Sequence, residues 1–168
     1  MRTSYAIALG SNRRHGRHGA PAGVLRAAIA EIQAAGLAIT ALSSIRTTPA
    51  LGPAGRGFAN AAALIETDLE PAYLLALLKS IERRFGRRRG RRWGPRVLDL
   101  DIILWSQGPF TAEGLVIPHP EFRRRRFVLD PLVEIAADWR DPLTHASIRQ
   151  LLHRLSRRSP VDRSESRS

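Results

Sequence analysis

The chain has 168 residues and a net charge of +12, with no cysteine and with Lys79 as its single lysine, so arginine supplies nearly all of its positive charge. This length suits one domain that buries roughly two thirds of its unfolded surface. Without cysteine nothing favours an oxidising compartment, and neither a membrane-spanning run nor a leader-like segment is present, so we expect a cytoplasmic protein.

Alternating and helical apolar spacing predicts the regular elements in chain order. Strands are expected over 3–9, 37–46 and 58–66, and helices over 21–35 and 69–85. Pro21 and Pro71 suit the first turns of the two helices, whereas Gly36 and Gly86 suit their ends. A strand over 98–104 completes the order strand, helix, strand, strand, helix, strand.

This order is typical of a ferredoxin-like βαββαβ sandwich, an α+β fold whose antiparallel sheet carries both helices on one face. A small C-terminal extension follows, with a brief strand over 115–117, an apolar segment or helix over 127–136 and an amphipathic helix over 148–155. Residues 156–168 are rich in arginine and serine, so we expect a disordered tail after one domain of residues 1–155.

Two aspartates stand out in the predicted strand over 98–104. Its apolar residues alternate with Asp99 and Asp101, which therefore point to the same face, roughly 6.5 to 7 Å apart. Two such carboxylates repel each other unless a cation lies nearby, and a hard divalent ion with oxygen ligands is the natural occupant. The alternative is an edge strand that uses charged residues against aggregation.

Arginines cluster immediately before this strand and again further along the chain. Eight of them lie between residues 83 and 96 with no acidic residue among them, and four more occupy 123–126. The guanidinium group offers a planar fork of donors that suits phosphate oxygens. Both clusters are also compatible with solvated loops, and the overall charge would attract nucleic acid nonspecifically.

Three further polar residues are candidates for a site or for a structural role. Glu82 falls in the last turn of a predicted helix, where the helix dipole disfavours an acid, so it should have a partner. Asn60, near the start of an apolar strand, suits either the edge of a heterocycle or a neighbouring backbone group. His119 stands between two prolines beside the second arginine cluster, where a ligand or a structural hydrogen bond would fix it.

Several motifs, in this order along residues 4 to 155, make the chain resemble the 6-hydroxymethyl-7,8-dihydropterin pyrophosphokinase family. The most specific is Arg92-Trp93-Gly94-Pro95-Arg96 followed by Leu98-Asp99-Leu100-Asp101. The others include Ala8-Leu9-Gly10-Ser11-Asn12, Leu51-Gly52-Pro53, Phe58-Ala59-Asn60-Ala61-Ala62 and Ile117-Pro118-His119-Pro120.

The resemblance implies roles for the matching residues. Asp99 and Asp101 would hold two Mg²⁺ ions that bridge the phosphates of ATP, the co-substrate. The catalytic arginines, which stabilise charge during transfer, would be Arg87, Arg92 and Arg96. The other ATP-binding residues would be Glu82, Ile102, His119 and Arg125. The pterin-binding residues would be Thr48, Pro49, Leu51, Phe58, Asn60, Trp93, Asp99 and Phe127.

An enzyme of this kind transfers pyrophosphate from ATP to the hydroxymethyl group of 6-hydroxymethyl-7,8-dihydropterin, giving the pterin diphosphate and AMP in tetrahydrofolate biosynthesis. We expect a cytoplasmic monomer that binds neither a membrane nor a specific nucleic acid. The alternative is a basic ferredoxin-like RNA-binding module, because RNA-recognition domains share this order of elements. Against that alternative, no predicted strand carries the basic and aromatic signature of such domains.

Overall fold

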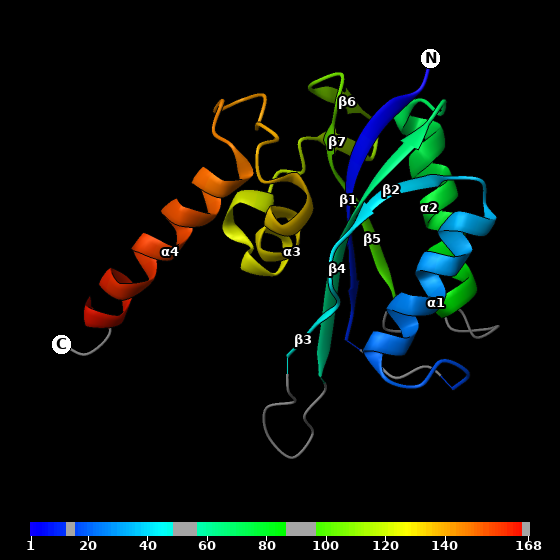
Figure 1. Ribbon diagram of the computed structural model, residues 1–168, viewed down its shortest axis with the longest axis horizontal. Coiled ribbons are helices and arrows are strands. Elements are labelled where there is room, and N and C mark those ends of the chain that lie inside the picture. The colour runs from blue at the N-terminus through cyan, green and yellow to red at the C-terminus, as the bar shows by residue number, and fades with distance from the viewer. Residues whose placement is uncertain (13–15, 49–56, 87–96, 166–168) are drawn as a thin grey trace.

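The computed structural model describes residues 1–12, 16–48, 57–86 and 97–165, with side chains as far as Arg157 (Figure 1). Its centre is an antiparallel sheet in which β2, β4, β1 and β5 lie side by side in that order, and β3 extends the sheet beside β4. The strands are β1 (Thr3–Ser11), β2 (Ala38–Leu42), β3 (Arg46–Thr48), β4 (Phe58–Thr67) and β5 (Asp99–Trp105).

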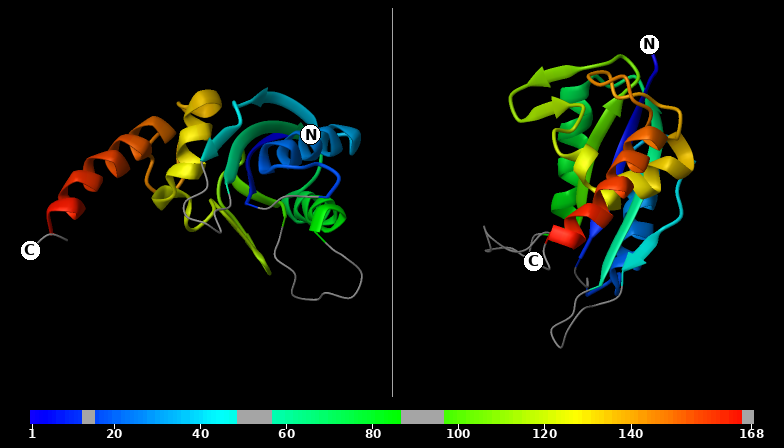
Figure 2. Two further views of the ribbon diagram at one scale, coloured as in Figure 1. Left: turned by 90° about the horizontal axis from the view of Figure 1, so that it is seen from below. Right: turned by 90° about the vertical axis from the view of Figure 1, so that its left-hand side faces the viewer.

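One face of the sheet is covered by α1 (Pro21–Ala34) and α2 (Pro71–Gly86), which form the main core with it (Figure 2). Alternate residues of the strands, such as Ile7, Leu9 and Leu100, contribute fully buried side chains to this core. Helical spacing places Leu78 of α2 against them. The prediction of a ferredoxin-like α+β sandwich is therefore confirmed.

The opposite face is covered only in part. There α3 (Arg126–Ala136) and α4 (Ile148–Glu165) pack on a second core that includes Ala6, Ala62 and Ile103 (Figure 2). Alanine on the two central strands leaves room for a helix to approach the backbone closely. The C-terminal extension thus buries one half of this face and leaves the other half available for a site.

The alternation over 98–104 predicts a strand with one buried face, and β5 departs from this prediction. The register between β1 and β5 shifts between Ala6 and Ile7, and Leu104 consequently joins Ile103 in the second core instead of following Ile102 into the main core. Strict alternation therefore holds only for the first part of β5. That part carries Asp99 and Asp101.

The remaining elements refine the predicted boundaries. The predicted strand over 37–46 becomes β2 and the first residue of β3. A hairpin of β6 (Phe110–Ala112) and β7 (Leu115–Ile117) follows β5, and the short 3-10 helix η1 (Phe122–Arg124) precedes α3.

Helix α4 differs from the prediction of a helix over 148–155 and a disordered tail from 156 onward. It continues to Glu165, because adding residues to an existing helix requires no new nucleus and no apolar face. Among the described helices, none has the length and apolar character needed to cross a membrane.

Candidate active site

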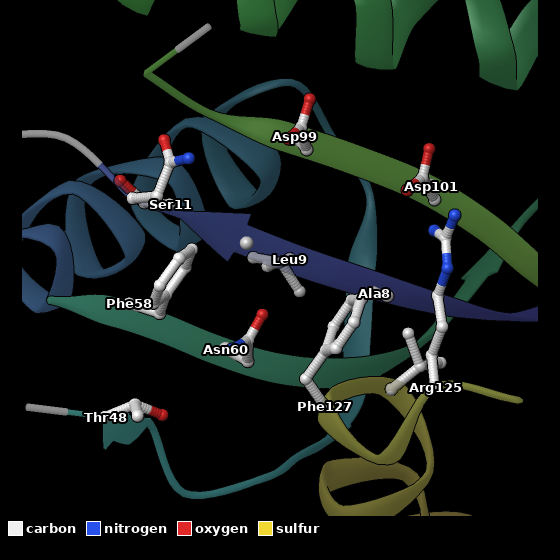
Figure 3. Close-up of a pocket in the computed structure, with 13 residues that line it drawn as sticks. Ala8, Leu9, Ser11, Thr48, Phe58, Asn60, Asp99, Asp101, Arg125 and Phe127 are labelled. Atoms are coloured by element: carbon white, nitrogen blue, oxygen red, sulfur yellow. The ribbon is translucent and has the colours of Figure 1, made fainter. Parts of the chain in front are cut away.

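A cavity of about 640 Å³ opens on the half of the second sheet face that α3 and α4 leave uncovered (Figure 3). This volume lies in the range of small-molecule sites. Its lining comes from β1, β3, β4, β5 and the segment that begins α3. The lining residues are Ala8, Leu9, Gly10, Ser11, Asn12, Thr48, Phe58, Asn60, Asp99, Asp101, Arg125, Phe127 and Val128.

Strand register brings together residues that lie far apart in the sequence. Gly10 of β1 pairs with Asn60 of β4 on one side and with Asp99 of β5 on the other. Residues directly opposite each other in antiparallel strands project from the same face. The amide of Asn60 and the carboxylate of Asp99 therefore face one cavity, with a residue that has no side chain between them.

Gly10 leaves room for the close approach of Asn60. A Cβ atom at position 10 would lie 3.3 Å from Oδ1 of Asn60, closer than an ordinary van der Waals contact. Without a Cβ atom at position 10, the side-chain amide of Asn60 can project from β4 into the cavity. Gly10 belongs to the Ala8-Leu9-Gly10-Ser11-Asn12 motif, and β1 continues past the predicted end of the strand at residue 9 to include Gly10 and Ser11.

The pair of carboxylates fits a divalent cation that also binds phosphate. Asp99 and Asp101 project together from β5 into the cavity and are accessible to solvent (Figure 3). In the described part of the chain, no three His, Cys, Asp or Glu residues gather closely enough to hold a metal ion. A cation here would take its other ligands from a bound molecule and water, which is the usual coordination of Mg²⁺ at nucleotide sites.

Two aromatic rings flank Asn60 on the other side of the cavity. Phe58 of β4 is 49% exposed and Phe127 of α3 is 51% exposed, although both rings are large and apolar (Figure 3). Exposed apolar side chains that line one cavity indicate a surface to be covered by a flat apolar ligand. Thr48, the cross-strand partner of Phe58, adds a hydroxyl to the lining beside the Phe58 ring.

Arg125 brings positive charge to the end of the cavity that holds the carboxylates. Its guanidinium carbon lies 5.7 Å from the centre of the Phe127 ring, and its side chain extends toward β5 beside Asp101 (Figure 3). An arginine close to a carboxylate and an aromatic face is well placed to bind a phosphate oxygen.

His119 lies next to this end of the cavity but is not part of its lining. Its backbone N–H donates to the carbonyl of Ile103 at 3.0 Å, and its Nδ1 accepts the N–H of Glu121 at 3.1 Å. Burial lowers the pKa of His119 below its ordinary value of 6.5, while Asp101 opposes this change and Arg125 adds to it. The neutral ring, with Nδ1 as acceptor, carries its proton on Nε2 and can donate it to an anion.

Glu82 has the partner that its place in the helix predicts. Its carboxylate accepts from Nζ of Lys79 at 3.0 Å and from the backbone N–H of Leu100 at 3.3 Å. Burial raises the pKa of Glu82 above its ordinary value, and Lys79 opposes this change. Glu82 lies beneath β5, outside the cavity lining, where it satisfies an amide of a strand that forms the edge of the described sheet.

The other predicted site residues divide into two groups. Ile102 buries its side chain in the main core, so only its backbone is available to a ligand. Six lie outside the described residues, namely Pro49, Leu51, Arg87, Arg92, Trp93 and Arg96. The predicted site did not include six residues of the lining, namely Ala8, Leu9, Gly10, Ser11, Asn12 and Val128. Most of them are small or apolar, so their side chains carry little chemical signal.

Comparison with known proteins gives a consistent family. The profile of the family described as 7,8-dihydro-6-hydroxymethylpterin-pyrophosphokinase (HPPK) matches residues 6–137. The 2-amino-4-hydroxy-6-hydroxymethyldihydropteridine pyrophosphokinase of Synechocystis sp. is 41% identical over 132 residues, which cover 78% of this chain and 68% of that relative. The enzyme of the same name from Haemophilus influenzae is 44% identical over 140 residues, covering 82% of this chain and 84% of the relative.

A solved structure shares the fold. The crystal structure of Plasmodium falciparum HPPK-DHPS superposes with a TM-score of 0.64 at 12% sequence identity, over 92% of this chain and 43% of that chain. At this identity the match shows the fold alone, and it places the fold within a longer protein.

Proposed function

Because the chain belongs to the 7,8-dihydro-6-hydroxymethylpterin-pyrophosphokinase family, we propose that the cavity on the second face of the sheet is where its reaction takes place. The chain transfers pyrophosphate from ATP to the hydroxymethyl group of 6-hydroxymethyl-7,8-dihydropterin in folate biosynthesis. The observation that carries our proposal is the row formed by Asn60, Gly10 and Asp99, which brings a heterocycle-reading amide and a metal-binding carboxylate into one cavity.

The pterin occupies the end of the cavity formed by β3, β4 and α3. The rings of Phe58 and Phe127 lie on either side of the bound heterocycle, and their exposed apolar surface becomes buried on binding. Asn60 both donates and accepts hydrogen bonds along the edge of the ring. Thr48 adds a polar contact, and the motif resemblance assigns Pro49, Leu51 and Trp93 to the same substrate.

The triphosphate of ATP occupies the end of the cavity near β5. Asp99 and Asp101 would hold two Mg²⁺ ions there, which would supply positive charge against the phosphate oxygens. Arg125 and the Nε2–H of His119 bind phosphate oxygens from the other side. The motif resemblance assigns Glu82, Ile102, Arg87, Arg92 and Arg96 to the same nucleotide, Ile102 through its backbone.

The residues of the chain act mainly by positioning and by electrostatic stabilisation, as in phosphoryl transfer generally. The hydroxymethyl oxygen of the pterin attacks the β-phosphorus of ATP in line. A new oxygen–phosphorus bond forms as the bond from the β-phosphorus to the oxygen of the α-phosphate breaks, and AMP leaves. Arginine side chains stabilise the charge that gathers on the leaving α-phosphate. The hydroxyl proton passes to solvent, since no general base is assigned.

We assign this activity to residues 1–155 of a cytoplasmic monomer that has no specific affinity for nucleic acid. The test is AMP formation by the purified chain in the presence and absence of Mg²⁺ and of the pterin alcohol. AMP should form only when both are present. Turnover that persists with a chelator in excess would contradict the metal assignment, and RNA binding that survives high salt without turnover would favour the RNA-binding alternative.

A further inference from the structure

A polar cluster beside the cavity joins α3 to the segment that leads into β3. Glu134 of α3 accepts hydrogen bonds from the backbone N–H of Ser44 at 3.2 Å and from Nε of Arg46 at 3.1 Å. The hydroxyl of Ser44 lies 2.9 Å from one carboxylate oxygen of Glu134 and 3.0 Å from the other. One carboxylate thus connects α3 with the segment that leads into β3, and we call these three residues the Glu134 clamp.

The two elements that the Glu134 clamp joins, β3 and α3, both contribute residues to the cavity lining. Arg46 is the cross-strand partner of Asn60, and two residues further along β3 Thr48 is the partner of Phe58. On the helix, Glu134 lies seven positions after Phe127, which is two helical turns along the same face. Thr48 and Phe127 are therefore carried by the two elements that the clamp joins, and Phe58 lies on β4 as the direct neighbour of Thr48.

Stability alone does not account for this arrangement. The side chains of Arg46 and Glu134 are 49% and 30% exposed, and ion pairs this accessible contribute little to the free energy of folding. The bonds from Ser44 and Arg46 nevertheless outweigh the effect of burial and lower the pKa of Glu134. The clamp thus keeps a charged group between α3 and β3, and the solvent that screens this group limits what it adds to the free energy of folding.

We propose that Glu134 is a positioning residue for the pterin. It sets the separation between β3 and α3 and, because Thr48 of β3 pairs with Phe58 of β4, the spacing of the rings of Phe58 and Phe127. The proposal rests on the assignment of this end of the cavity to the pterin. The carboxylates of β5 lie on the far side of β1 and β4 from β3. Loosening the clamp should therefore change the pterin end of the cavity more than the end that holds the carboxylates of β5.

The test compares the KM values for the two substrates. Glu134→Ala should raise the KM for 6-hydroxymethyl-7,8-dihydropterin on the order of tenfold, because small displacements of positioning groups have large effects, while the KM for MgATP stays within about twofold. Glu134→Gln keeps an acceptor oxygen for Ser44 and should show a smaller rise. Ser44→Ala combined with Glu134→Ala should lose no more than Glu134→Ala alone, because both substitutions open the same clamp.

Asp130→Ala is the matched control. Asp130 lies one turn earlier on α3 and pairs with Arg126 of the same helix at 3.6 Å, so it does not reach β3. Its replacement should leave both KM values unchanged. The proposal is overturned if Glu134→Ala leaves the KM for the pterin unchanged, raises both KM values equally, or raises the KM for the pterin no more than Asp130→Ala does.

Phe58→Ala separates this proposal from the assignment of the pocket. If Phe58→Ala weakens pterin binding and Glu134→Ala does not, the clamp has no positioning role and the pocket assignment stands. If Phe58→Ala leaves the KM for the pterin unchanged, the pocket assignment itself fails.

Discussion

Asp141 anchors the segment before α4 and provides a test of the electrostatic reasoning. Its carboxylate is fully buried and accepts hydrogen bonds from Nε of Arg123 at 2.5 Å and from Nη2 of Arg123 at 2.8 Å. The hydroxyl of Thr144 and the backbone N–H of Leu143 donate to the same carboxylate at 2.6 Å and 3.0 Å. Asp141→Asn should therefore destabilise the fold.

The size of this effect follows from the pKa of Asp141. Burial raises this pKa, but the bonds from Arg123, Thr144 and Leu143 outweigh burial and lower it from 3.8 to about 2. At about 1.4 kcal/mol for each pH unit of difference, the ionised form stabilises the folded state by roughly 2 kcal/mol at pH 7. This stabilisation is fully present above the pKa of the unfolded chain and is lost as the pH falls toward the pKa of the folded state.

Urea unfolding of the wild type and of Asp141→Asn measures the difference directly. The variant should lose about 2 kcal/mol of unfolding free energy between pH 5 and pH 7, and roughly half of that loss should disappear at pH 3. Asp138→Asn is the control, because Asp138 is 85% exposed and pairs with Arg149 at the surface, so its loss should stay below about 1 kcal/mol. A loss for Asp141→Asn that is the same at pH 3 and pH 7 would refute the assignment of its low pKa.

Three further predictions concern the cavity. Phe58→Ala and Asn60→Ala should raise the KM for the pterin more than the KM for ATP, whereas equal losses for both substrates would argue against the pterin pocket. Gly10→Ala should raise the KM for the pterin several-fold, because a Cβ atom 3.3 Å from Oδ1 of Asn60 displaces the amide. An unchanged KM would mean that the Asn60 amide does not hydrogen-bond to the pterin. His119→Gln, which retains a donor near the position of Nε2, should keep more ATP affinity than His119→Asn, and the reverse order would contradict donation from Nε2.

Local patterns in the sequence predicted the parts of the site that depend on local geometry. Asp99 and Asp101 share a face because side chains alternate along any strand. The order of elements then identified the sandwich, since few topologies accommodate it.

Features that depend on contacts across the fold were not predictable in the same way. The row of Asn60, Gly10 and Asp99 requires the register of three strands, which no local pattern specifies. Ile103 is buried on the second face because α3 and α4 pack there, although the alternation of β5 predicts a solvent-facing residue. The partner of Glu82 could be anticipated from the helix dipole, but the amide of Leu100 could not be identified without the tertiary structure.

AMP formation by Asp99→Ala and Asp101→Ala tests the central claim most directly, namely that this cavity is where pyrophosphate is transferred. Both carboxylates are accessible to solvent, so each variant should keep the circular dichroism spectrum and thermal unfolding midpoint of the wild type. Each should nevertheless lose AMP formation by at least two orders of magnitude, roughly the effect of removing a group that stabilises transferring charge. Full turnover in either folded variant would contradict the assignment of the site.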